Sequence, residues 1–358
     1  MPVLHRRIGF EVELLAPEGS DRRALAHRVA AAVDGRVSAV FHTDSEPSLV
    51  PGMGQFWHLT PGFDVHDAAG ALLASFVDDI TLVADIRDAA RPAGVPSTAD
   101  GWFRVLSDDP RLLRLVTRHE RADVVFDRLL DTTAALFGTE VDVLGPVRRL
   151  DDRSGATVAL ATALPRGRDR PCEIVTAPVT ADHHATLDLL LGHARALGFT
   201  VPVEAAVHLH FDGRPFRAVG PFTNLVRLFA LWRAELWAAL GTNPAATKIR
   251  PLPPELLGLT EAGHAWPALQ DAARSTGLSK FFDLNLTALL TDEPARDTVE
   301  VRILPGSADA DEIVERARLV EQLLDRCLEA EPVPPPPPGG GDLHALTGVR
   351  HTSSAAPE

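Results

Sequence analysis

Three short segments, far apart in the chain, each place two polar side chains two positions apart among apolar or β-branched residues. The segments are Glu11-Val-Glu13, His208-Leu-His210 and Glu300-Val-Arg302. Residues i and i+2 of a β-strand point to the same face, so each pair directs two polar groups to one side of a sheet. The flanking residues, such as Phe10, Val207 and Ile303, are of the types that pack in sheets. The sequence therefore predicts a sheet with one unusually charged face.

Glutamates that share a sheet face repel one another unless cations lie between them, and a divalent-metal site would explain such a cluster. A fourth strand-like segment, Cys172 to Pro178, adds another glutamate. Carboxylate oxygens suit Mg²⁺ or Mn²⁺, whereas zinc normally takes more nitrogen or sulfur ligands. The predicted metal ligands are Glu11, Glu13, Glu173, His208 and Glu300. For any one pair alone, an ordinary ion pair or a solvated face is the simpler interpretation.

Arginines accompany these acids. Arg302 shares the face of Glu300, and Arg166, Arg168 and Arg170 directly precede the fourth segment. A guanidinium group binds phosphate or carboxylate through two parallel hydrogen bonds, and Mg²⁺ held by carboxylates most often also binds substrate phosphates. The pattern therefore indicates a site for a phosphate-bearing ligand.

Composition restricts the partners. The 358 residues include 35 Lys and Arg against 49 Asp and Glu, a net charge of -14, which argues against general binding of nucleic acid or anionic membrane. With no long apolar run and no secretory signal visible, we expect a cytoplasmic protein without a membrane span. The two cysteines, Cys172 and Cys327, are too few for a disulfide framework, and Cys172 is best interpreted as a buried structural thiol.

Strand and helix patterns follow one another along the chain. Ser20-Asp21 can cap a helix to about residue 33, and Asp109-Pro110 begins a helical region that ends at Gly138. Residues 224–240 are expected to form one helix and residues 281–290 a strand. The alternating apolar pattern favours an α+β fold with a mostly antiparallel, curved sheet and helices packed on its outer face.

The end of the chain has a different composition. Residues 331–358 contain five consecutive prolines and three consecutive glycines, with few apolar residues in periodic order. Such segments cannot bury enough apolar surface to offset the entropy of ordering. We therefore expect one catalytic domain over residues 1–330 and a disordered Pro/Gly-rich tail over residues 331–358.

Five segments stand in a recognisable order: Gly9-Phe-Glu11-Val-Glu13, Cys172-Glu-Ile-Val-Thr-Ala-Pro178, His208-Leu-His210-Phe-Asp212, Lys280 with Asp283-Leu-Asn285-Leu286, and Thr298-Val-Glu300-Val-Arg302-Ile-Leu-Pro-Gly306. Together, over residues 8–306, they resemble the amidoligase family of carboxylate-amine ligases. The resemblance implies a glutamine synthetase-like catalytic domain, of the fold shared with glutamate-cysteine ligase.

The resemblance also implies an activity. The expected enzyme uses ATP and Mg²⁺ (or Mn²⁺) to phosphorylate a carboxylate, lets an amine displace the phosphate and releases ADP. Its partners would be a small-molecule or peptide carboxylate and an amine donor, with no nucleic acid and no membrane. Neither the substrates nor the oligomeric state can be predicted from the sequence.

Metal ligands follow from the positions of the matching motifs. By resemblance, Glu11 and Glu13 would bind two different metal ions, and Glu173 and Glu300 would be further ligands. His208 would join the metal site to the nucleotide site. These assignments agree with the pattern of acids described above.

Phosphoryl transfer needs positive charge around the oxygens more than covalent help from the protein. By resemblance, His210 would lie near the phosphates, and Arg302 would hold the transferring phosphoryl group or the substrate carboxylate. Lys280 is a further phosphate-binding candidate. Arg168 and Arg170 are nucleotide-binding candidates from the arginine-rich loop.

We also expect a closing loop, a general base and an aspartate that approaches the substrate. An acyl phosphate must be kept from water, so we expect a closing loop, with residues 248–254 and the arginine-rich loop as candidates. Asp212 is the candidate for an unpaired acid that deprotonates the amine. The family's Asp-x-Ser-Leu strand ending has two possible counterparts here, Asp44-Ser-Glu46-Pro-Ser48-Leu49 and Asp108-Asp109-Pro-Arg-Leu112. Either Asp44 or Asp109 could approach the substrate.

Two rival interpretations stay open. A metal-dependent hydrolase could use His208 and His210 as zinc ligands, as a His-x-His strand does in some barrel enzymes. A non-catalytic binding protein could keep the same fold without turnover. Metal analysis would separate zinc from magnesium, and conversion of ATP to ADP would separate an enzyme from a binding protein.

Overall fold

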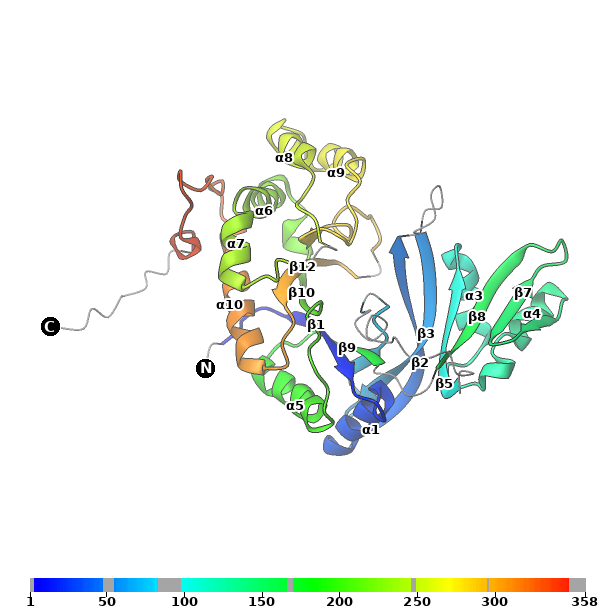
Figure 1. Cartoon of the computed structure of the whole chain (residues 1–358). Helices are drawn as coiled ribbons and strands as arrows, with labels where there is room; N and C mark the ends of the chain where they lie inside the picture. Colours follow the sequence, from blue (N-terminus) through cyan, green and yellow to red (C-terminus); the bar gives the residue numbers. More distant parts are fainter. Residues whose placement is uncertain are drawn as a thin grey trace. The chain divides into compact units, whose positions relative to one another are not determined.

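The computed structural model describes residues 3–47, 55–80, 82, 98–165, 170–245, 249–294 and 296–347 (Figure 1). The chain divides into two compact units. Unit 1 comprises residues 1–12, 178–188 and 203–358, and unit 2 comprises residues 13–177 and 189–202. With 3₁₀ helices marked η, the elements in chain order are β1 (Ile8–Ala16), α1 (Arg22–Ala32), β2 (Arg36–Pro47), β3 (Gln55–His66), β4 (Leu72–Val77), β5 (Thr98–Ser107), α3 (Pro110–His119), η1 (Phe126–Arg128), α4 (Asp131–Phe137), β6 (Val141–Leu144), β7 (Val147–Asp151), β8 (Thr157–Pro165), β9 (Arg170–Thr176), α5 (His183–Ala196), β10 (Ala206–Asp212), η2 (Arg214–Phe216), α6 (Val219–Leu231), α7 (Arg233–Leu240), α8 (Pro254–Glu261), α9 (Trp266–Arg274), β11 (Leu284–Asn285), β12 (Thr298–Pro305), α10 (Ala310–Cys327) and η3 (Leu343–Ala345).

Unit 1 is built on strands in the order β11-β12-β10-β1, and each neighbouring pair is antiparallel. Along β10 and β12 the residues between the polar positions are completely buried: Leu209, Phe211, Val299 and Val301. These residues alternate with the polar ones, so the predicted separation of an apolar from a polar face holds in this unit.

Helices of unit 1 pack on one another and on the sheet. Helix α6 contacts α8 and α10, and α7 contacts β12. The single helix expected over residues 224–240 is two helices, because the chain leaves the α conformation at Trp232, where φ is -104° and ψ is 19°. The predicted end at Gly241 is confirmed by its left-handed conformation, with φ of 69°.

Residues 331–347, part of the segment for which the sequence predicted disorder, contact α6, α7 and α10. Val333 and Leu343 are buried. Asn224 of α6 accepts a hydrogen bond from the backbone N–H of Val333, and Trp232 Nε1 donates to the carbonyl of Pro334 at 2.7 Å. The rest of the predicted tail, residues 348–358, lies outside the described residues.

Unit 2 contains strands in the order β9-β4-β3-β5-β8-β7-β6, and β2 pairs with β3 along its length. Strand β3 continues through a proline. Pro61 lies between the part of β3 that pairs with β5 and the part that pairs with β4. Its missing N–H therefore falls where β3 changes partners, and the strand tolerates the proline.

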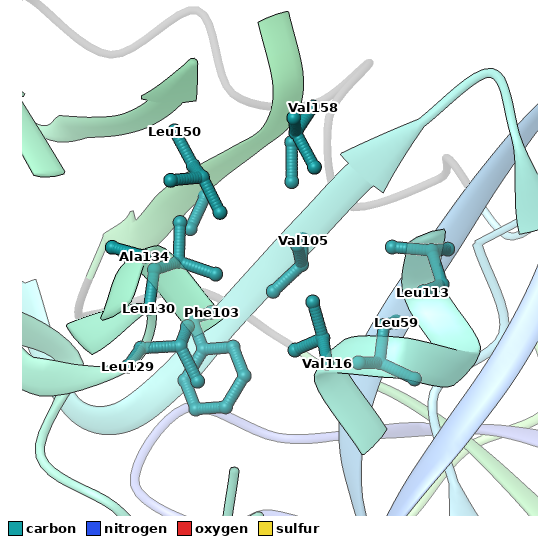
Figure 2. Close-up of a cluster of buried hydrophobic side chains, with 12 residues drawn as sticks. Leu59, Phe103, Val105, Leu113, Val116, Leu129, Leu130, Ala134, Leu150 and Val158 are labelled. Carbon is teal, nitrogen blue, oxygen red and sulfur yellow. The ribbon is translucent and has the colours of Figure 1, made fainter. Parts of the chain in front are cut away.

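One hydrophobic core of unit 2 lies between the sheet and the helices α3 and α4. Figure 2 shows its side chains, which come from β3, β5, β7, β8 and the helices. The buried members are Leu59, Phe103, Val105, Leu113, Val116, Leu129, Leu130, Ala134, Leu150, Val158, Ala159 and Ala161. Asp109 caps α3 by accepting from the N–H of Arg111, and Gly138 ends α4 with a left-handed conformation, as the sequence predicted.

The predicted α+β class with an antiparallel sheet is confirmed. The prediction of a strand over residues 281–290 is wrong in its length, because only Leu284 and Asn285 of this range pair with β12. Asn285 Oδ1 accepts from the N–H of Thr287, and this turn ends the strand. Among the described residues, no helix has the length and apolarity needed to cross a membrane.

Candidate functional site

The candidate site of unit 1 is made by polar residues on three neighbouring strands. In the antiparallel register, Glu11 of β1 lies opposite His208 of β10, and His210 of β10 lies opposite Glu300 of β12. Arg302 follows Glu300 by two positions and shares its face. The structure thus brings together five of the residues that the sequence singled out.

The side chains of these residues are in direct contact. His208 Nδ1 lies 3.2 Å from Glu11 Oε2 and 3.7 Å from Glu300 Oε1. His210 Nε2 lies 3.0 Å from Glu11 Oε1. Arg302 Nη1 donates to Glu300 Oε1. The side chains of His208 and Glu300 are only 5% and 8% exposed, so the charges face one another in a largely dry environment.

Burial and charge act against each other on the two carboxylates. Burial raises the pKa of Glu11, but the charge of His210 and the hydrogen bonds from both histidines outweigh it, and the pKa falls well below its usual value. Burial also raises the pKa of Glu300, and Arg302 reverses that effect, so its pKa is lowered. Both glutamates are therefore ionised at neutral pH and able to bind a cation.

The two histidines shift in opposite directions. Burial lowers the pKa of His208, and repulsion by Arg302 lowers it further. Burial opposes the charge on His210 as well, but attraction to Glu11 prevails and raises its pKa. A metal would bind either imidazole through an unprotonated nitrogen.

Ligand atoms of Glu11, His210 and Glu300 all lie within 4.8 Å of one another. Two carboxylates and an imidazole at this spacing form a donor set that a divalent cation can use. The geometry is thus compatible with the metal-binding role predicted for Glu11 and Glu300. It also gives His210, which the resemblance associated with phosphates, a position among possible metal ligands.

Three further residues adjoin the cluster. Asn285 Nδ2 donates to Glu300 Oε2 at 2.7 Å, and Thr298 Oγ1 lies 3.3 Å from His210 Nδ1. Arg296 Nη1 lies 3.6 Å from Glu11 Oε1 and is 68% exposed. Thr298 precedes Glu300 by two positions, so strand alternation could have identified it. Asn285 belongs to the fourth of the recognised motifs, whereas Arg296 has no local signal, because chain reversal brings it near Glu11.

Glu13 and Glu173, the other predicted metal ligands, belong to unit 2. Glu13 follows Glu11 by two positions in β1 and is 6% exposed. Glu173 lies in β9 opposite Val77 of β4 and is half-buried. Their role as metal ligands stays a prediction.

The structure describes only some of the residues predicted to bind the nucleotide. Lys280 precedes β11, is half-buried, and has its Nζ 5.4 Å from the ring centroid of Phe281. Arg166 and Arg168 lie outside the described residues. Arg170 begins β9, but its side chain is also outside the described part.

We predicted that Asp212 is an unpaired acid, and this prediction is wrong because Asp212 pairs with Arg214. Arg214 donates to both of its carboxylate oxygens, with Nη2 2.6 Å from Oδ2. The hydrogen bonds from Arg214 lower the pKa of Asp212. A carboxylate held ionised in this way is a weak proton acceptor at neutral pH.

Asp44 and Asp109, the two candidates for the family's strand ending, both lie in unit 2. Asp44 lies in β2 opposite His58 and accepts from the N–H of Ser45 at 2.7 Å. Asp109 is half-buried and caps α3, and hydrogen bonds from Arg111 lower its pKa to about 2. A structural role is thus evident for Asp109, and which aspartate approaches a substrate stays open.

Both cysteines are buried. Burial raises the pKa of the Cys172 thiol, and it raises that of Cys327 to about 12. A thiol that stays protonated at neutral pH is a poor nucleophile. The structure supports the interpretation of Cys172 as a structural residue.

Comparison with known proteins gives one match. A family model described as "Putative amidoligase enzyme" matches residues 4–324, which is nearly the whole chain. No curated protein and no solved structure gives a significant match.

Proposed function

Because the chain belongs to the amidoligase family, we propose that it is an ATP-dependent carboxylate-amine ligase with a divalent-metal site in unit 1. The observation that carries the proposal is the cluster of half-buried Glu11 and His210 with buried Glu300, whose ligand atoms lie within 4.8 Å of one another. The substrates would be a small-molecule or peptide carboxylate and an amine donor. The glutamine synthetase-like fold is part of the same proposal.

The donor set fits a divalent cation. Glu11 and Glu300 offer ionised carboxylates, which Mg²⁺ and Mn²⁺ prefer, and His208 and His210 offer nitrogen, which transition metals accept readily. A bound cation would neutralise charge on phosphate oxygens. Glu13 and Glu173 are proposed as ligands of the cation sites as well.

Arg302 supplies the positive charge of the protein itself. Its guanidinium is 15% exposed and lies against Glu300, so it is oriented before any ligand arrives. A pre-oriented guanidinium beside buried carboxylates can bind a phosphoryl group or a substrate carboxylate through two hydrogen bonds. We propose this role for Arg302, with Lys280, Arg168 and Arg170 as further contacts to the nucleotide.

The proposed reaction has two displacements. An oxygen of the substrate carboxylate attacks the γ-phosphorus of ATP, and the bond to ADP breaks, which leaves an acyl phosphate. The amine nitrogen then attacks the acyl carbon, phosphate leaves, and the amine loses a proton to a base. Asp212 stays the candidate for that base, and the hydrogen bonds from Arg214, which lower its pKa, would make it a weaker proton acceptor.

The test is ATP turnover with mixtures of carboxylates and amines in the presence of Mg²⁺ or Mn²⁺. Continuous ADP formation should require both an acid and an amine, because the acid alone can react only once at each site before the acyl phosphate blocks it. Glu11→Gln and Glu300→Gln should each lower the rate by about a hundredfold or more, the effect expected when charge stabilisation is lost. Glu261→Gln is the control, since Glu261 is 55% exposed and pairs with Arg227 away from the cluster.

Retention of full ligation by both Gln variants would rule out the metal role of these glutamates. The contact of both histidines with Glu11 keeps a zinc hydrolase as the second candidate. That candidate requires stoichiometric zinc in the purified protein and hydrolysis without ATP. Its observation would replace the ligase proposal.

A further inference from the structure

The side-chain amide of Asn285 has one orientation that satisfies its neighbours. Its Oδ1 accepts from the backbone N–H of Thr287 at 3.0 Å and from Thr287 Oγ1 at 2.6 Å. A backbone N–H can only donate, so the oxygen must face Thr287. The Nδ2 group consequently faces Glu300 Oε2, at 2.7 Å.

The backbone around Asn285 is also fixed. Asn285 lies directly opposite Glu300 in the pairing of β11 with β12. Asp283, two residues before Asn285, is completely buried, accepts from Arg233 Nε at 2.5 Å and offers its carbonyl to the N–H of Arg302. The amide is thus held from the backbone side as well as by Thr287.

Glu300 therefore has a donor on each oxygen, Arg302 on Oε1 and Asn285 on Oε2. An ionised carboxylate has about four lone-pair sites, so each oxygen can still accept another ligand. With both oxygens held, the rotation of the carboxylate is set by its donors before a cation binds. Of these two donors, only Asn285 is uncharged and does not compete with a cation by repulsion.

We propose that Asn285, oriented by Thr287, is a positioning residue that fixes the Glu300 carboxylate for binding a divalent cation. The inference rests on the proposed function, because it takes Glu300 as a cation ligand. Asparagine meets both requirements, whereas aspartate could accept from Thr287 but has no N–H for Glu300. Groups that orient metal ligands typically change metal affinity by about 10- to 100-fold when removed.

The experiment is titration of the full chain with Mn²⁺ alone, followed by calorimetry or by the electron spin resonance signal of free Mn²⁺. Asn285→Ala should weaken Mn²⁺ binding by about 10- to 100-fold. Asn285→Ser should do the same, since a serine hydroxyl can still accept from the N–H of residue 287 but is one atom shorter and cannot reach Glu300. The serine variant keeps the test valid if the alanine variant does not fold.

The matched control is Asn243→Ala. Asn243 also accepts from an N–H two residues ahead, that of Ala245, and donates Nδ2 to a carbonyl, that of Val203. Its loss should cost comparable thermal stability but leave Mn²⁺ affinity unchanged. A purely structural role of Asn285 would make the two alanine variants alike in both measurements, and the inference would be wrong.

The variant Glu300→Gln distinguishes a failure of the positioning role of Asn285 from a failure of the metal site itself. If it loses Mn²⁺ binding while both Asn285 variants bind as the wild type does, positioning by Asn285 is overturned and the metal site stands. If Glu300→Gln itself binds Mn²⁺ as the wild type does, the metal role in the proposed function fails.

Discussion

At the residue scale, a buried arginine organises part of unit 2. Arg22 of α1 is completely buried, donates twice to the carbonyl of Pro61 and lies 3.5 Å from Asp78 Oδ1. Its guanidinium stacks at 4.1 Å on the ring of Trp102, and Arg104 donates to the other oxygen of Asp78. Two arginines thus share one buried carboxylate, and loss of that carboxylate would leave buried positive charge.

We predict that Asp78→Asn lowers the free energy of unfolding at pH 7 by about 3 kcal/mol. This is the low end of the cost of breaking a buried ion pair, because the carbonyl of Pro61 still accepts from Arg22. The measurement is urea denaturation. Asp142→Asn serves as the control, since its partner Arg149 is 37% exposed and such surface pairs contribute about 1 kcal/mol or less.

The same variant gives a pH dependence with a definite sign. Burial raises the pKa of Asp78, but Arg22 and Arg104 outweigh it, so the pKa in the folded protein is lowered. The stabilisation is therefore complete above the unfolded value of about 3.9 and is lost as the pH falls through the folded value. The difference in unfolding free energy between wild type and Asp78→Asn should shrink only in strongly acidic solution. A difference that shrinks already near neutral pH would contradict this assignment.

Thiol reactivity is a second prediction at this scale. Cys172 and Cys327 are buried, and burial raises the pKa of both thiols. Neither should react with a thiol reagent such as dithiobisnitrobenzoate in the native protein, and both should react after unfolding. Rapid labelling of Cys172 under native conditions would show that this strand opens readily.

At the element scale, one asparagine makes several of the hydrogen bonds that hold the segment after α10 against the helices of unit 1. Asn224 of α6 is 2% exposed. Its Nδ2 lies 3.2 Å from each of the carbonyls of Cys327, Glu329 and Glu331, and its Oδ1 accepts from the N–H of Val333. Asn224 therefore joins the end of α10 to the proline-rich segment.

We predict that Asn224→Ala destabilises the protein by about 1–3 kcal/mol, because it leaves buried carbonyl and N–H groups unsatisfied. Hydrogen exchange should become faster in residues 331–347. Thermal denaturation and exchange mass spectrometry measure the two effects. Unchanged exchange in this segment would mean that the other contacts, such as Trp232 with Pro334, are sufficient.

Elements differed in how far their sequence specified them. Helix starts at Asp21 and Asp109 and ends at Gly138 and Gly241 were predictable, because a cap acts within a few residues of itself. The short strand β11 was not, since its length depends on pairing with β12 and on the turn at Asn285. Contacts of β11 with another strand, and not its own sequence pattern, therefore set its length.

At the scale of the whole molecule, the proposed metal site links three strands that are far apart in sequence. Glu11, His210 and Glu300 come from β1, β10 and β12. A cation that binds them in the folded state and not in the unfolded chain must stabilise the fold by mass action.

We predict that Mn²⁺ at a hundred times its dissociation constant adds about 2.7 kcal/mol to the stability of the wild-type protein. The melting temperature should rise with Mn²⁺ concentration in differential scanning calorimetry. Chelation by EDTA should reverse the rise, and Glu11→Gln should greatly reduce it. A melting temperature that does not depend on Mn²⁺ in the wild type would contradict the metal site.

The sequence by itself determined which residues share a face. Glu300 and Arg302, like His208 and His210, point the same way because side chains alternate along any strand, and this alternation follows from the covalent geometry of the backbone. The matching order of motifs determined the family. The class of fold followed from the alternating apolar pattern.

Only the tertiary structure decided which faces meet. The register that sets Glu11 opposite His208, 197 positions later, depends on how distant segments pack, and no local pattern encodes it. The pairing of Glu300 with Asn285, 15 positions apart, likewise depends on how β11 and β12 meet. The same holds for the contacts of Val333 with Asn224. The pair of Asp212 with Arg214 is different, because it is a local contact between residues two positions apart at the turn after β10. Packing, and not residue type, therefore selected the residues that can bind a ligand together.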